Sequence, residues 1–86
     1  MTVSWEGRIA GEFHGYAYGA VHELADGSRW RQRGKAAEPV YRERPAAKLL
    51  RDPSSGRMFL DVEGTGAVVE VVPDAPGPWG GSWGAY

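Results

Sequence analysis

The fold of this chain is decided by residues 18–33, which read YGAVHELADGSRWRQR. Two runs of alternating apolar and polar residues flank the dipeptide Asp26-Gly27. Alternation with a period of two is typical of a half-buried β-strand. Asp-Gly between two such runs predicts a tight hairpin. The stretch therefore indicates β structure, and by itself it indicates no chemistry.

The register of this hairpin follows from how it sorts side chains between the two faces. A two-residue loop would mix apolar and charged side chains on each face. A three-residue loop at 25–27 places Leu24 and Trp30 on one face and sets Glu23 opposite Arg29 on the other. Such a loop needs a left-handed glycine at its end. Because a slip of one residue moves every side chain to the other face, we predict the three-residue loop.

A second hairpin is predicted within residues 57–73, where apolar residues again alternate. A turn at Gly64-Thr65 pairs Leu60 with Val69 and creates one apolar face. Glycine at the first turn position suits a type II′ turn. We therefore predict a second two-stranded unit with its apolar face inward.

Further short strands are predicted at 7–13, 40–44 and 46–51. The last of these is also compatible with a short helix, but it is too brief to decide by periodicity, and we favour a strand.

Thirteen glycines and six prolines leave no stretch long enough for a stable amphipathic helix. We predict an all-β domain over residues 1–73, closed into a five- or six-stranded SH3-like barrel, with an oligonucleotide-binding-type barrel as the alternative. Residues 74–86, rich in Pro, Gly and Trp, are predicted to form a flexible tail.

Several short segments within residues 16–73 carry a likeness to known proteins. They are 23–32, Tyr41, 44–45 and 62–64. These segments resemble small uncharacterised bacterial SH3-like barrel proteins, some of which are carried as mobile gene cassettes. The resemblance implies a fold; because that group has no established activity, it implies no catalytic residues. The run 42–44 is more charged and less aromatic than the tyrosine-rich stretch of that group.

Composition excludes several classes of chemistry. The chain has no cysteine, so it has no disulfide, no thiolate metal site and no cysteine nucleophile. The first residues lack a basic start followed by an apolar stretch, so we expect no signal peptide. No apolar run approaches the ~18 residues of a membrane span. We expect a cytoplasmic protein without a membrane partner.

Charge is segregated although the net charge is only −1. Residues 28–51 hold eight basic and two acidic side chains, and the rest of the chain carries a net charge of −7. Arg29, Arg31 and Arg33 alternate, which predicts a row of guanidinium groups ~6.8 Å apart on one strand face. Arg42 and Arg44 repeat the pattern. With nearby aromatic rings this arrangement suits single-stranded nucleic acid, and the alternative is a solvated face paired with glutamates on neighbouring strands.

Exposed aromatic residues predict a protein-binding surface. The expected groove is built from Tyr16, Tyr18, Trp30 and Tyr41. Trp79 and Trp83 in the tail are expected to dock into a groove of this chain or of a partner. The favoured hypothesis is therefore a non-enzymatic interaction module that binds a protein partner or a second copy of itself. A nucleic-acid binder that uses the five arginines is the alternative.

No pattern in the sequence predicts an enzyme, a cofactor or a metal site. His14 and His22 are ~27 Å apart on an extended chain, too far to share an ion. No serine has a recognisable catalytic neighbour. The carboxylates of the second hairpin are interpreted as a solubilising face; they are Asp61, Glu63 and Glu70.

Overall fold

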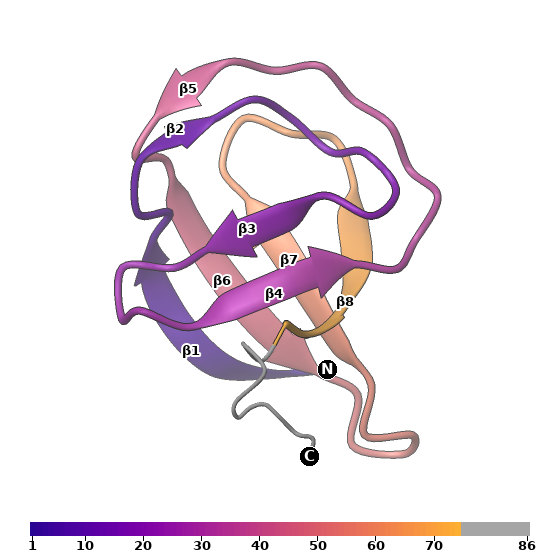
Figure 1. The fold of residues 1–86 in the computed structure, drawn as a ribbon. Coiled ribbons are helices and arrows are strands. Elements are labelled where there is room, and N and C mark those ends of the chain that lie inside the picture. The colour runs from indigo at the N-terminus through magenta and orange to yellow at the C-terminus, as the bar shows by residue number, and fades with distance from the viewer. Residues whose placement is uncertain (75–86) are drawn as a thin grey trace, which may run out of the picture.

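Eight β-strands and their connections make up residues 1–74, the part of the chain that the computed structural model describes (Figure 1). Their bounds are Thr2–Arg8 (β1), Glu12–Phe13 (β2), Val21–Glu23 (β3), Arg29–Gln32 (β4), Arg42–Glu43 (β5), Ala46–Arg51 (β6), Met58–Val62 (β7) and Val68–Pro73 (β8). The all-β prediction is confirmed. Residues 1–74 contain no helix that is long and apolar enough to cross a membrane.

Six of the strands form one antiparallel sheet in the order β1-β6-β7-β8-β4-β3, and β2 pairs separately with β5. The main sheet curls until its two outermost strands meet beyond their ends (Figure 1). They meet at a single antiparallel bridge between Ile9 and Leu24, next to a hydrogen bond from the Ala10 N–H to the Glu23 carbonyl (2.9 Å). The sheet is therefore curled but not closed into the predicted barrel, because its two outermost strands join only around this bridge.

The first hairpin has the predicted register. His22 lies opposite Trp30 and Glu23 lies opposite Arg29. Gly27 has φ = 91°, the left-handed angle that a three-residue loop requires. Alternation along two strands and one glycine were therefore sufficient to set this pairing.

The second hairpin has the predicted register but a different turn. Leu60 pairs with Val69 as expected. The hydrogen bond that closes the turn runs from the Thr65 N–H to the Val62 carbonyl (3.2 Å), so Gly64, with φ = 91°, occupies the third turn position. The predicted type II′ turn at Gly64-Thr65 is wrong. The Thr65 hydroxyl also donates to the Val62 carbonyl (2.6 Å), which stabilises the earlier turn within a longer loop.

The short strands agree less closely with the predicted ranges. The stretch 46–51 is a strand, as favoured. The strand expected at 7–13 is two strands, because β1 starts five residues earlier and the chain bends at Gly11. The strand expected at 40–44 shrinks to two residues, because Arg44 takes a left-handed φ of 47°.

The core fills the inside of the curled sheet. Its buried apolar side chains are Ile9, Phe13, Tyr16, Leu24, Ala47, Leu49, Leu60, Val62, Val69 and Val71. Trp5, Trp30 and Met58 pack against this cluster while partly exposed. Of the four residues expected inside, Leu24, Leu60 and Val69 are fully or almost fully buried, whereas Trp30 is only partly buried.

Candidate functional site

Tyr16 does not belong to a surface groove. Its side chain is only 3% exposed, and its ring packs edge-on against Phe13 with centroids 5.6 Å apart. The hydroxyl accepts a hydrogen bond from the Val62 N–H and lies within bonding distance of the Ala67 carbonyl, each at 3.1 Å. Burial raises the pKa of Tyr16. The predicted partner-binding role of Tyr16 is therefore corrected: the residue ties its loop to the β7–β8 connection.

The other predicted groove aromatics point to different places. Trp30 is half-buried against the core, and its indole N–H donates to the Ser28 hydroxyl (3.0 Å). Tyr41 is 62% exposed and its ring centroid lies 5.4 Å from that of His14. Tyr18 is 70% exposed and lines a hollow that does not include Tyr41. The structure therefore does not gather these rings into one groove.

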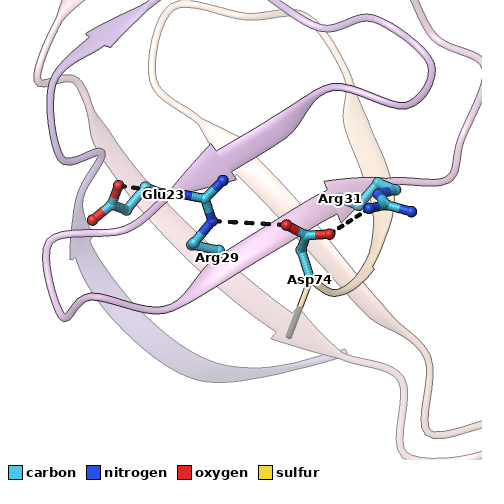
Figure 2. A network of polar contacts seen from close by, with 4 residues as sticks. All are labelled: Glu23, Arg29, Arg31 and Asp74. Atoms are coloured by element: carbon cyan, nitrogen blue, oxygen red, sulfur yellow. Dashed lines mark hydrogen bonds and ion pairs between the residues drawn. The ribbon is translucent and has the colours of Figure 1, made fainter. Parts of the chain in front are cut away.

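Arg29 and Arg31 on β4, and Arg33 directly after it, lie on one face, as the alternation predicts. Arg29, Arg31 and Arg33 are exposed, whereas Gln32 between them is buried. The Asp74 carboxylate lies between the first two guanidinium groups, 2.5 Å from Arg31 Nη2 and 3.7 Å from Arg29 Nε (Figure 2). The predicted basic row is thus partly neutralised by a residue of the same chain.

The folded part extends to Asp74, one residue beyond the predicted domain boundary. The sequence prediction assigned it to the tail, but its backbone N–H donates to the Arg29 carbonyl (2.9 Å) and its side chain is only 18% exposed. The two tail residues predicted to dock, Trp79 and Trp83, lie outside the described residues.

Acidic groups continue to alternate with basic groups across this face. Glu23 lies 4.0 Å from Arg29 on the side opposite Asp74 (Figure 2). Near Arg33, the side chain of Glu70 pairs with Arg57 (3.9 Å), while its carbonyl accepts the Arg33 N–H (2.8 Å). The outer face of β3, β4 and β8 is therefore of mixed charge.

Arg42 and Arg44 do not extend the row on β4. They lie on or beside β5, which pairs with β2 and is not part of the main sheet. The Arg42 guanidinium lies against Gly64, and the Arg44 carbonyl accepts a hydrogen bond from Arg8 Nη1 (2.9 Å). The five arginines predicted as one nucleic-acid surface thus divide between two sheets.

One hollow unites a predicted aromatic residue with two predicted arginines. Its volume is about 390 Å³, and we call it the Tyr18 groove. The lining residues are Tyr18, Gly19, Val21, Arg31, Gln32, Arg33 and Val72. Val21 and Val72 flank Arg31 on the two neighbouring strands, so the hollow combines aliphatic surface, one exposed ring and two guanidinium groups. This combination suits a ligand with an apolar body and a carboxylate.

Gln32 fixes the backbone around this groove. Its Oε1 accepts the Ala17 N–H (3.0 Å), and its Nε2 donates to the carbonyls of Gly34 (2.8 Å) and Ala36 (2.7 Å). The side chain is 1% exposed, so these bonds are shielded from water. Gln32 thereby joins the residue before Tyr18 to the loop that follows Arg33.

The two histidines are placed apart and differ in environment. His14 is exposed and lies 3.5 Å from a Glu12 carboxylate oxygen. His22 is buried against the rings of Phe13 and Tyr16, and its Nε2 atom has no hydrogen-bond partner. Within residues 1–74, no three His, Asp or Glu side chains lie together in a way that could hold a metal ion.

His22 is expected to make the fold sensitive to mild acid. Burial lowers its pKa below the usual 6.5. The unfolded chain therefore binds a proton at a higher pH than the folded chain, so stability present above about pH 6.5 is lost as the pH falls toward the lowered folded value. Urea unfolding at pH 7.5 and 5.5 measures this loss. We expect His22→Leu to flatten the decline and His14→Gln to leave it in place; a decline abolished by His14→Gln would contradict this assignment.

Comparison of the chain with protein-family models, with curated proteins and with solved structures finds no match in any of the three. The resemblance to gene-cassette SH3-like proteins therefore stays a prediction.

Proposed function

We propose that this protein is a non-enzymatic interaction module that binds a segment of a protein partner in the Tyr18 groove. The observation that carries this proposal is the convergence of a 70% exposed tyrosine ring, two valines and two guanidinium groups in one hollow. Tyrosine and arginine are enriched among residues that dominate protein–protein binding energy. Arg31 lies on β4, and the hydrogen bonds of Gln32 to Ala17, Gly34 and Ala36 hold the connections that carry Tyr18 and Arg33, as a preorganised site requires.

The chemistry of the groove indicates the kind of segment it takes. Arg31 is already engaged by Asp74, whereas Arg33 forms no ion pair with any residue in 1–74. An acidic side chain of the partner can pair with Arg33. A bulky apolar side chain next to it can cover the ring of Tyr18 and the two valines. We therefore expect a short motif in which Asp or Glu adjoins an aliphatic or aromatic residue.

Nucleic-acid binding is the alternative proposal, and the same arginines with Tyr18 would serve it. A polyanion laid along β4 would bring phosphates against the carboxylates of Asp74, Glu23 and Glu70, which lie on or next to that face. Repulsion between the phosphates and these carboxylates would weaken binding. A short acidic-apolar motif avoids this repulsion because it places one carboxylate at Arg33, so the protein partner is favoured.

Selection of random heptapeptides on the immobilised full chain tests the proposal. We expect the bound peptides to be enriched in an acidic residue next to Phe, Leu, Ile or Val. Tyr18→Ala and Arg33→Ala are each expected to weaken the best peptide at least about tenfold, measured by fluorescence polarisation. Tyr41→Ala is the matched control, because it removes a similarly exposed tyrosine outside the groove, and affinity should not change.

Two outcomes would contradict this proposal. One is a set of peptides without acidic-apolar preference whose binding is insensitive to Tyr18→Ala. The other is micromolar binding of a fluorescent single-stranded oligonucleotide that falls steeply with salt and is lost when the arginines of β4 are replaced. That second result would establish the nucleic-acid alternative instead.

A further inference from the structure

The molecule has a second opening, between β2 and β3. After the hydrogen bond from Ala10 to Glu23, the chain that follows β1 leaves β3 and pairs with β5 as β2. In Figure 1 these two strands run above one another without joining. A hollow of about 310 Å³ lies between them, lined by residues 9–15 and 20–23. Both of its walls are strand edges.

The edge of β3 presents unpaired backbone groups to this hollow. In an antiparallel ladder, residues alternate between hydrogen-bonded and non-hydrogen-bonded pairs. The Gln32 N–H donates to the Ala20 carbonyl (2.7 Å), so Ala20 and Gln32 form a hydrogen-bonded pair. Hydrogen-bonded pairs recur at every second residue, and Val21 and Glu23 are therefore in non-hydrogen-bonded pairs with β4. Their N–H and C=O groups therefore point away from β4. The Glu23 carbonyl accepts the Ala10 N–H. The N–H and C=O of Val21 and the N–H of Glu23 therefore stay available to a new strand.

The edge of β2 is open in the same way. The Arg44 N–H donates to the Gly11 carbonyl (2.9 Å), so the next residue, Glu12, is in a non-hydrogen-bonded pair with Glu43 of β5. The backbone N–H and C=O of Glu12 therefore face away from β5. Because Glu12 lines the hollow, unpaired backbone donors and acceptors stand on both walls. Such edges are templates for strand pairing.

The rim of the opening is acidic. Glu12 stands on one wall and Glu23 on the other, with side chains 59% and 53% exposed. Glu43 lies opposite Glu12 on β5. The Tyr18 groove, in contrast, carries two arginines, so the two openings differ in charge and would select different ligands.

We propose that the opening between β2 and β3 binds an extended polypeptide segment bearing Lys or Arg, which adds as a strand along the edge of β3. Main-chain hydrogen bonds to Val21 and Glu23 give affinity, and alternate side chains give specificity. Basic side chains of the segment reach Glu12 and Glu23. The site differs from the Tyr18 groove because it uses the backbone edge of β3 and the carboxylates of its rim. Val21 is the one lining residue that both hollows share.

Titration of the full chain with a capped Lys-Val-Lys-Val-Lys peptide, followed by amide NMR, tests this proposal. Expected results are shifts and slowed hydrogen exchange at the amides of Val21 and Glu23. The same peptide with its alternate amides N-methylated keeps the charge but cannot complete a strand ladder, so its affinity should fall at least about tenfold. The pair Glu12→Lys and Glu23→Lys should weaken binding similarly, whereas Glu63→Lys, an exposed change elsewhere, should have little effect.

The pattern of NMR shifts decides between strand addition and simple charge attraction. Equal binding of the N-methylated peptide, or shifts spread over all acidic residues, would overturn the proposal. Shifts confined to Tyr18, Arg33 and Val72 would overturn it too and would place the segment in the other groove. Absence of binding at millimolar peptide would also reject it. Because these probes are basic, the result is separable from the test of the Tyr18 groove, whose probes are acidic.

Discussion

Replacement of Gly15 by alanine is expected to lower the free energy of unfolding by about 2–6 kcal/mol. Gly15 has φ = 101°, an angle that costs a residue with a Cβ atom about 1–3 kcal/mol. A Cβ atom there would also overlap the Glu38 carbonyl oxygen and lie 2.8 Å from the Val40 nitrogen. These backbone atoms cannot turn aside as a side chain can, so the overlap adds roughly another 1–3 kcal/mol. The sum is a large part of the 5–15 kcal/mol that stabilises a typical domain.

Gly27→Ala is the matched control for this experiment. Gly27 has a similar φ of 91°, but no atom lies within 4 Å of the position that its Cβ would take. Alanine there should lower the free energy of unfolding by only about 1–2 kcal/mol. Urea unfolding followed by circular dichroism measures both variants. Equal losses at the two positions would show that the contact with residues 38–40 is not the cause.

Gln32→Leu is expected to give the second large loss of stability. The substitution keeps the size of the side chain but leaves the Ala17 N–H and two carbonyl oxygens without their partner. An unsatisfied buried group costs about 1–3 kcal/mol. Because these three backbone partners are only partly buried, we expect about 1–2 kcal/mol for each and about 3–6 kcal/mol in total. The loops that carry Tyr18 and Arg33 should loosen as well, and peptide affinity for the Tyr18 groove should fall.

Gln32→Glu separates the loss of hydrogen bonds from the loss of packing. The carboxylate can still accept from Ala17, but it places a charged oxygen against the Gly34 and Ala36 carbonyls. Its pKa in the folded state should therefore rise, so this variant should regain stability as the pH falls, when the protonated acid can donate again. The measurement is the urea midpoint between pH 7 and 5. A midpoint that falls with pH more steeply than that of the unchanged protein would contradict this account.

Local pattern was sufficient to predict both main hairpins. In each, alternation of side chains left only one register with an apolar inner face, and a glycine supplied the turn. The sequence also placed Arg29, Arg31 and Arg33 on one face correctly. What it could not show was the neutralising Asp74, because the pairing of β4 with β8 joins segments that are distant in the chain.

The errors at aromatic positions have a related cause. Tyr16 sits among glycines, and a segment of that composition looks like an exposed loop. Its hydroxyl finds partners at Leu60, Val62 and Ala67, more than 40 residues away. The burial of Gln32 could not be predicted either. One polar residue in an alternating strand does not indicate that the loops on both sides will cover its side chain. The place of Val72 in the Tyr18 groove depends on the pairing of β4 with β8, which no local pattern specifies.

The order of strands also sets a timetable for folding during synthesis. β1 is complete at Arg8, but its partner β6 begins only at Ala46. Ribosomes add 5–20 residues per second, so the first strand waits roughly 2–8 s before it can pair. The β3–β4 hairpin, whose strands are adjacent, can form within microseconds of leaving the exit tunnel. Until β6 is made, Trp5 and the apolar side of β1 are therefore uncovered in the nascent chain. A chaperone that binds exposed apolar segments would act in this interval.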